Sequence, residues 1–228
     1  MKLMKRILAA MLAAIIVAGT FMPAPAQAAS RISSGVKFAG WADNAETSCY
    51  FSTKRQGISA FEYKIFYNSG RLKKKGSSIV YTNSAGTQQI CKVEGLTSQS
   101  CTFVSIRAKK NGAWTTWSSK YALVPLFRSD WIKITTNKYT QTTKLSWKKI
   151  TGTTQYDIYL STSKDGGWQK VKTTTGSGVT LNRFNGAKFK SGQTYYFKVI
   201  AKKNYNGKWI TSAGNTRSMR NGYFWYIY

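Results

Sequence analysis

A repeated segment constrains the fold of this chain more than any other feature. Ala108-Lys109-Lys110-Asn111-Gly112-Ala113-Trp114 recurs as Ala201-Lys202-Lys203-Asn204 and, after a two-residue insertion, Gly207-Lys208-Trp209. The offset of about 90 residues is the size of a small domain, so we expect two homologous units. The junction is expected between Tyr121 and Ser129, where Pro125 cannot donate a hydrogen bond to a central sheet ladder.

Within each unit the apolar residues alternate as they do in strands. Large apolar side chains stand at every second position, which lines one face of a strand. The second unit has Leu145-Ser146-Trp147, Tyr156 to Leu160 and Tyr195 to Ala201; the first has Ser48 to Phe51, Tyr63 to Tyr67 and Thr102 to Ala108. Glycine-containing turns separate these runs, and no amphipathic helix of useful length is present after the first 29 residues. The pattern predicts an all-β sandwich or barrel in each unit.

Three of these runs resemble strands B, C and F of a fibronectin type III domain. They are Leu145-Ser146-Trp147, Tyr156-Asp157-Ile158-Tyr159 and Gly192 to Ala201. The resemblance implies that Trp147 and Tyr156 lie in the core, and that Tyr195 is the corner tyrosine whose hydroxyl bonds to upstream backbone. The first unit is less similar, since Phe51 stands in place of the tryptophan and Thr102 in place of the corner tyrosine. The resemblance implies two tandem immunoglobulin-like (fibronectin type III) β-sandwiches.

The first residues have the pattern of a secretory signal peptide. Lys2, Lys5 and Arg6 precede the uncharged apolar run from Ile7 to Ala18, and Ala26-Gln27-Ala28 offers small residues to a signal peptidase. The run is shorter than the roughly 20 apolar residues that span a bilayer. We therefore expect a signal peptide at 1–28, one domain at 30–125, and a second at 127–228 with an aromatic C-terminal strand. The mature chain is expected to be secreted, without a transmembrane span, and released or held at the cell surface.

The mature chain is strongly basic. The whole sequence has 35 Lys and Arg against 7 Asp and Glu, a formal net charge of +28. Such a surface attracts polyanions through counterion release, and the affinity falls as salt rises. Outside a cell, the candidate partners are teichoic acid, acidic glycans and extracellular DNA, among which net charge does not choose. The alternative is that the charge only keeps the protein soluble near a negative envelope.

The residues that most catalytic sites require are absent or scattered. The chain has no histidine, which excludes Ser-His-Asp and Cys-His sites and removes the commonest general base. The seven acids are dispersed, and no two form a motif of the kind that glycosidases use. Glu62 and Asp157 are expected at outward positions of strand C, paired with lysines. We therefore expect no enzyme activity, no cofactor and no metal site.

Three cysteines, Cys49, Cys91 and Cys101, lie in the first unit. An exported chain can oxidise two of them, and the odd count leaves one over. A Cys91–Cys101 disulfide is preferred because the intervening segment is short and contains Gly95. A Cys49–Cys91 bridge between strands B and E, or three buried thiols, are the alternatives.

Paired and tripled lysines mark the candidate polyanion-binding residues. Lys73, Lys74 and Lys75 are expected in the connection between strands C and C′ of the first unit; Lys148, Lys149, Lys202 and Lys203 are expected toward the B–C and F–G loops of the second. If the two sandwiches are joined head to tail, these ends meet, and we expect a cationic groove at the junction. The alternative is that the lysines are solvated loop ends.

Aromatic residues offer a second kind of site. The rings of Trp114, Trp117, Trp168, Trp209 and the terminal segment Tyr223 to Tyr228 are suited to stacking on sugars. The alternative for Trp168 and Trp209, which follow glycine turns, is packing against a sheet edge. The terminal segment is apolar enough to form a strand that pairs with its own sheet or with another copy. The sequence thus favours a secreted binding or adaptor protein for anionic envelope polymers or glycans. A structural module that self-associates through sheet edges, and a carbohydrate-binding module that uses tryptophans, are the alternatives.

Overall fold

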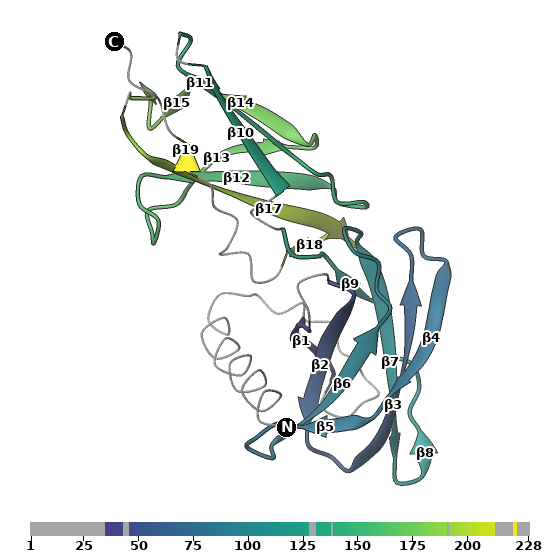
Figure 1. Cartoon of the computed structure of the whole chain (residues 1–228). Coiled ribbons are helices and arrows are strands. Elements are labelled where there is room, and N and C mark those ends of the chain that lie inside the picture. Colours follow the sequence, from purple (N-terminus) through teal and green to yellow (C-terminus); the bar gives the residue numbers. More distant parts are fainter. Residues whose placement is uncertain are drawn as a thin grey trace. The chain divides into compact units, whose positions relative to one another are not determined.

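The structure is a computed structural model that describes residues 35–42, 46–127, 131–137, 139–190, 192–212 and 221–222. The expected signal peptide at 1–28 and the terminal segment 223–228 lie outside these residues. The chain divides into two compact units, with the boundary between Leu123 and Val124. This boundary falls inside the stretch from Tyr121 to Ser129, which contains Pro125 (Figure 1).

The described part of the first unit is built from strands in two antiparallel sheets. One sheet has the order β1-β2-β6-β5, and the other has the order β4-β3-β7-β8, with β9 also pairing with β7. The strands are β1 (Lys37–Trp41), β2 (Ser48–Lys54), β3 (Ile58–Phe66), β4 (Leu72–Ser78), β5 (Val80–Thr82), β6 (Gln88–Glu94), β7 (Thr102–Lys110), β8 (Ala113–Trp114) and β9 (Tyr121–Leu123).

The second unit repeats this plan with small changes. A three-stranded sheet has the order β10-β11-β14, and a larger one has the order β13-β12-β17-β18, with β19 also pairing with β17. The strands are β10 (Ile132–Asn137), β11 (Thr142–Trp147), β12 (Gln155–Ser161), β13 (Gln169–Thr174), β14 (Gly178–Leu181), β17 (Tyr195–Tyr205), β18 (Lys208–Thr211) and β19 (Asn221–Gly222). A short hairpin, β15 (Arg183–Phe184) and β16 (Ala187–Lys188), lies between β14 and β17 in the sequence.

The strand order identifies the fold of each unit. Named in chain order, the first unit has strands A, B, E and D in one sheet and C′, C, F and G in the other, which is an immunoglobulin-like sandwich. The second unit has A-B-E against C′-C-F-G. The expected fold, two tandem immunoglobulin-like sandwiches of the fibronectin type III kind, is therefore confirmed. The first unit adds β5 as a fourth strand beside β6.

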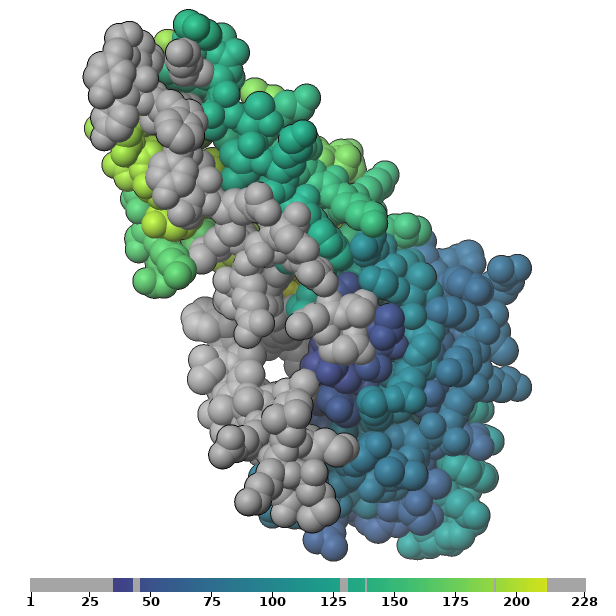
Figure 2. Space-filling view, in the orientation of Figure 1, coloured from purple at the N-terminus to yellow at the C-terminus, as the bar shows by residue number. Residues whose placement is uncertain are grey.

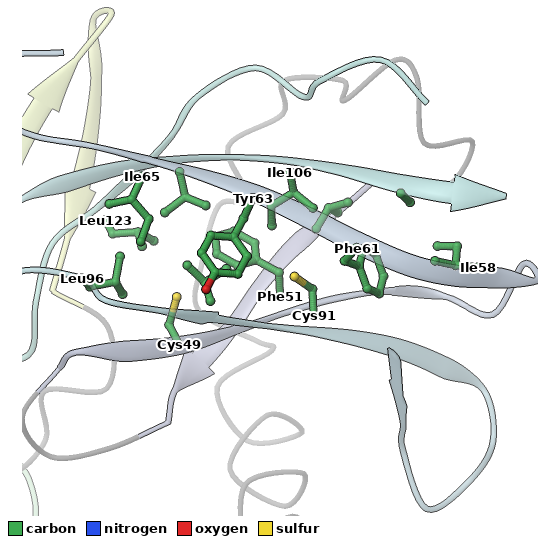
Figure 3. Packing of buried hydrophobic residues seen from close by; sticks show 14 residues of the cluster. Cys49, Phe51, Ile58, Phe61, Tyr63, Ile65, Cys91, Leu96, Ile106 and Leu123 are labelled. Atoms are coloured by element: carbon green, nitrogen blue, oxygen red, sulfur yellow. The ribbon is translucent and has the colours of Figure 1, made fainter. Parts of the chain in front are cut away.

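Alternation along each strand builds the core of the first unit. On β3, Phe61, Tyr63 and Ile65 are buried, while the residues between them are half-buried on the other face. These side chains pack against Phe51 of β2 and Ile106 of β7 (Figure 3). Phe51, which stands in place of the expected core tryptophan, is fully buried and contacts the rings of Phe38 and Tyr121.

The structure contains no bridge between Cys91 and Cys101, the preferred pair, and all three cysteines are buried, so this disulfide stays a prediction. Cys91 lies in the middle of β6, opposite Phe51, and its side chain points into the core (Figure 3). Cys49 is opposite Val93, so Cys49 and Cys91 are diagonal rather than direct partners across β2 and β6. Diagonal residues are about 7–8 Å apart, which is too far for a disulfide without backbone movement.

The residues that the resemblance assigned to the second core are buried. Trp147 is 6% exposed and packs edge-on against Phe127 and Tyr156. The Tyr156 hydroxyl accepts a hydrogen bond from the backbone N–H of Ile150 at 2.8 Å. The Tyr195 hydroxyl accepts one from the backbone N–H of Lys190 at 3.0 Å, which is the upstream bond of a corner tyrosine.

None of the residues that the structure describes forms a helix with the length and apolarity needed to cross a bilayer.

Candidate anion-binding faces

The lysine triplet Lys73-Lys74-Lys75 does not lie in a loop, contrary to the expected C to C′ connection. It lies inside β4, which is the outermost strand of its sheet. The blue atoms of this part of the chain are at the surface in Figure 2. Lys75 pairs with Lys64 and Lys74 with Ile65, so these two lysines alternate between the faces of the sheet; Lys73 is the extra residue of a β-bulge, because Leu72 is the next residue to pair, with Phe66. The three lysines therefore do not share one face.

Lys73 serves the fold. Its ammonium group donates hydrogen bonds to the carbonyl of Gly95 at 2.8 Å and to Thr97 Oγ1 at 2.7 Å, which fixes the turn between β6 and β7. Burial and then the neighbouring charge of Lys74 lower the pKa of Lys73. Lys75 is exposed and lies directly opposite Lys64 of β3, on the outer face of the sheet.

The other lysines predicted to bind anions also fall into two groups, exposed ones and ones that contact groups of the protein. Lys148 and Lys149 follow β11 in the B–C connection, and both are exposed. Lys202 and Lys203 lie within β17 rather than in a loop. Lys202 forms an ion pair with Asp157 at 3.1 Å, and Lys203 is 9% exposed, with its ammonium group 3.0 Å from the carbonyl of Gly152.

Aromatic and basic side chains gather on the outer face of the β4-β3-β7-β8 sheet. The Nζ atom of Lys64 lies 4.2 Å from the ring centre of Trp117, and the guanidinium carbon of Arg107 lies 4.8 Å from the ring centres of both Trp117 and Trp114. Cations at these distances are attracted by the ring quadrupole. We call this surface the first basic face; it comprises Lys64, Lys75, Arg107, Lys109, Trp114 and Trp117.

The segment after β8 is held on β7 by alternating backbone and side-chain hydrogen bonds. The backbone N–H groups of Thr115 and Ser118 donate to the carbonyls of Ala108 and Ile106, each at 2.8 Å. The hydroxyls of Thr115 and Ser118 accept in return from the N–H groups of the same two β7 residues, each at 3.0 Å. This docking positions Trp114 and Trp117 on either side of Arg107.

The second unit has a corresponding surface on the β13-β12-β17-β18 sheet. The Nζ atom of Lys198 lies 4.5 Å from the ring centre of Trp168 and 5.3 Å from that of Tyr159, and burial lowers its pKa. The Nζ atom of Lys202 lies 4.9 Å from the ring centre of Trp209. We call this surface the second basic face; it comprises Tyr159, Trp168, Lys170, Lys198, Lys202 and Trp209.

The two basic faces share the same placement of an acidic residue and of a cation that contacts a tryptophan, although individual residues differ. When Ala108 is aligned with Ala201, the β-pairing places Glu62 and Asp157 at the same position of strand C. Two residues further along strand C, the first unit has Lys64 opposite Ser105, and the second has Tyr159 opposite Lys198. The cation thus stands on strand C in the first unit and on strand F in the second, and in both units it contacts a tryptophan.

Carboxylates on both faces are neutralised. Glu62 accepts a hydrogen bond from Nε of Arg107 at 2.6 Å and forms an ion pair with the same guanidinium group. Asp157 is 3% exposed and accepts from Thr173 at 2.7 Å, with Lys202 at 3.1 Å and Lys170 at 3.9 Å. In the described ranges, no three His, Cys, Asp or Glu side chains gather to hold a metal ion. These pairs match the expected structural role of the two acids.

Sequence reasoning missed that tryptophans and cations occupy the same surface. Trp114, Trp117, Trp168 and Trp209 were considered as sugar-stacking residues, and the lysine runs as polyanion-binding residues, in separate hypotheses. Lys64, Arg107, Lys170 and Lys198 were not singled out, because they do not stand in runs. Outward positions on strands C, C′ and F, read with the period of two, would have found them.

No family model matches the chain, and no curated protein is significantly similar to it. Solved structures do match. A cytokine receptor complex shares 11% identity at a TM-score of 0.43, with 77% of this chain and 91% of that chain covered. A two-domain fibronectin type III segment from chicken tenascin shares 17% identity at a TM-score of 0.34, with 78% of this chain and 96% of that chain covered. Chicken CNTN1 domains FN1 to FN3 share 14% identity at a TM-score of 0.33, with 85% of this chain and 67% of that chain covered. The strand order described above, not this distant likeness, establishes the fold.

Proposed function

We propose that this protein is a secreted, non-catalytic binding protein that attaches to anionic polymers of a cell envelope or extracellular matrix through its basic surface. The observation that supports it most is the state of the described carboxylates on the sheets. Glu62, Glu94 and Asp157 are engaged by Arg107, Lys92 and Lys202, so these three carboxylates are already occupied by basic side chains, while the chain carries 35 Lys and Arg against 7 Asp and Glu. The tandem sandwich fold suits this role, since it presents broad rigid sheets, although a fold alone does not fix function.

Exposed lysines occur on both units. They include Lys75 on the first, and Lys148, Lys149, Lys170 and Lys172 on the second. An ammonium group binds phosphate, sulfate or carboxylate as a point charge, and each contact releases counterions. Affinity for a polyanion is therefore expected to be high at low salt. The logarithm of the binding constant should fall linearly as the logarithm of the salt concentration rises.

Self-association through sheet edges is the weaker alternative. The C′ edge of the first unit carries Lys74 and Lys75, and that of the second, β13, carries Lys170 and Lys172. Two such edges would place like charges opposite one another, and lysine on an edge strand is a common device against edge-to-edge pairing.

The test is retention of the full mature chain on immobilised acidic polysaccharide, with uncharged agarose and a neutral glucan as controls. The proposal predicts retention at low salt, elution by salt, and no retention on either control. Passage of the chain through the acidic column at low salt, or concentration-dependent dimerisation without retention, would contradict it.

A further inference from the structure

Lys64 and Lys75 of the first basic face stand directly opposite one another on β3 and β4. Directly opposed residues of an antiparallel pair have Cβ atoms about 4.5–5.5 Å apart, and like charges in such positions are destabilising. The third residue of the row, Ser105, carries no charge. Among the described residues neither lysine forms an ion pair, because the nearest acid of the face, Glu62, is engaged by Arg107. An external anion between the two ammonium groups would offset their repulsion.

The same row of the second basic face carries two cations as well. Tyr159 lies between Lys170 on β13 and Lys198 on β17 in the register of the sheet. Lys198 is half-buried against two aromatic rings, and among the described residues it forms no ion pair. Two units whose residues have diverged therefore both place a pair of cations at this position of the sheet.

Each face also carries a tryptophan with a substantial exposed surface beside a cation. Trp114 is 38% exposed; it lies opposite Lys109 and contacts Arg107. Trp209 is 46% exposed and contacts Lys202. An exposed indole offers a flat apolar surface on which a sugar ring can stack, on the same face of the sheet as the paired cations.

We infer that each basic face by itself binds an acidic polysaccharide, whose sugar rings stack on Trp114 of the first face or Trp209 of the second, and whose anionic groups lie between the paired cations Lys64–Lys75 or Lys170–Lys198. This inference rests on the proposed function and specifies its ligand and its side chains. An acidic sugar carries its carboxylate or sulfate directly on the ring, so charge and stacking surface lie within one residue. One cation of each pair lies close to an indole of its face, since the Nζ atom of Lys64 is 4.2 Å from the ring centre of Trp117 and that of Lys198 is 4.5 Å from the ring centre of Trp168. In a nucleotide, by contrast, the ribose separates the phosphate from the base that would stack.

The experiment measures binding of the full mature chain by calorimetric titration at low salt. The probes are alginate, which carries carboxylates on its rings, heparin, which carries sulfates as well, polyphosphate, which has no ring, single-stranded DNA and neutral dextran. Wild type is expected to bind alginate or heparin more tightly than polyphosphate and DNA at equal charge, and not to bind dextran. The relative affinities for alginate and heparin identify the anionic group.

Two sets of variants locate the site. Replacing Lys64, Lys75, Lys170 and Lys198 together by Gln is expected to weaken acidic-polysaccharide binding at least tenfold. The matched control replaces Lys37, Lys54, Lys133 and Lys144 by Gln; these exposed lysines lie on the other sheets of the two units, and the control removes the same charge. It is expected to weaken binding less than threefold. Trp209→Ala is expected to weaken alginate binding, whereas Tyr139→Ala, which removes an aromatic ring that is 85% exposed, is not.

The outcomes separate the two proposals. Equal losses in the two lysine variants would overturn the basic faces as the site while polyanion binding stands. A wild-type chain that binds none of the polyanions would overturn the proposed function as well. DNA or polyphosphate bound as tightly as alginate would overturn the assignment of the ligand. If the fourfold variant fails to fold, lysine acetylation of the wild type decides, since alginate should protect Lys64 and Lys75 more than Lys37 and Lys54.

Discussion

Buried tyrosine hydroxyls connect loops to strands in both units. In the second unit, Tyr156 and Tyr195 accept hydrogen bonds from backbone N–H groups of loops that precede their strands. In the first unit, Tyr121 donates to the carbonyl of Val36 at 2.7 Å, and burial raises its pKa. A buried backbone group that loses such a partner retains the full desolvation penalty, so each hydroxyl matters more than an average hydrogen bond.

The variant Tyr195→Phe tests one of these bonds. It removes the acceptor of the Lys190 N–H without changing the packing of the ring, and because this hydrogen bond is part-buried we expect the free energy of unfolding to fall by about 0.5–1.5 kcal/mol. Urea denaturation measures the change. Tyr196→Phe is the control, because this neighbouring side chain is half-buried and lies on the opposite face of β17. An equal effect of the two variants would contradict the role given to the Tyr195 hydroxyl.

The thiol of Cys91 predicts how stability depends on alkaline pH. Burial raises the pKa of Cys91 to about 12 from 9.0, although a hydrogen bond with Ser78 acts in the opposite direction. Since the folded pKa lies above the unfolded value, the native thiol keeps its proton while the unfolded chain loses it. The stabilisation is complete below pH 9 and is lost progressively toward pH 12.

We therefore compare wild type with Cys91→Ala by denaturation under reducing conditions. Between pH 9 and pH 10.5 the wild type should lose about 2 kcal/mol more than the variant. The difference between the two proteins at pH 7 serves as the reference, because it contains the cost of the smaller side chain. Parallel curves over this pH range would show that Cys91 does not titrate in the way its burial implies.

At the residue level, sequence reasoning identified the core better than the lysines. Trp147, Tyr156 and Tyr195 stand in strand patterns, and local spacing determines which face of a strand is buried. Lys73 and Lys203 stand in charge runs that look solvent-exposed, yet their ammonium groups bond to the carbonyls of Gly95 and Gly152. Only the tertiary fold brings those carbonyls near, so no local signal marks these lysines as structural. The Cys91–Cys101 disulfide, which the structure does not contain, was inferred from a short loop, and a short loop does not show where Cys91 points.

At the level of elements, the edge strands explain how the sheets remain separate. The strand β4 is exposed on its outer side and ends the sheet order, and its sequence Leu72-Lys73-Lys74-Lys75-Gly76 is poor in β-branched residues. Charged side chains on such an edge oppose pairing with a second copy. The sequence predicted strands C and F from their alternation, but it did not predict β4, because the lysine run hides the period of two.

Replacing Lys74 and Lys75 by Thr should allow this edge strand to pair with the edge strand of a second copy. Threonine favours strands and carries no charge, so we expect concentration-dependent association that wild type does not show. Sedimentation velocity over a range of protein concentrations measures it. The variant with Lys54 and Lys144 replaced by Thr loses the same charge on the interior strands β2 and β11 and should associate no more than wild type. Association in both variants would attribute the effect to net charge, and association in neither would show that the lysines do not guard the edge.

At the level of the whole molecule, most of the fold that could be predicted from the sequence was predicted from the repeat. It indicated two similar units, and the strand runs with their glycine turns indicated sandwiches. The basic faces could not be predicted in the same way, because they combine residues from strands C′, C, F and G that are adjacent only after folding. In the second unit, the Lys198 contacts join β17 to β12 and to the loop before β13.

Nuclear magnetic resonance of the tryptophan indole N–H groups shows whether Trp114 and Trp209 contact a bound acidic sugar. Acidic oligosaccharide is titrated into the full mature chain at low salt, and the indole signals are assigned by single Trp→Phe variants. The account predicts that the signals of Trp114 and Trp209 shift with added ligand and return with added salt, while the signal of the buried Trp147 stays in place. Unchanged Trp114 and Trp209 signals in the presence of bound ligand would contradict it.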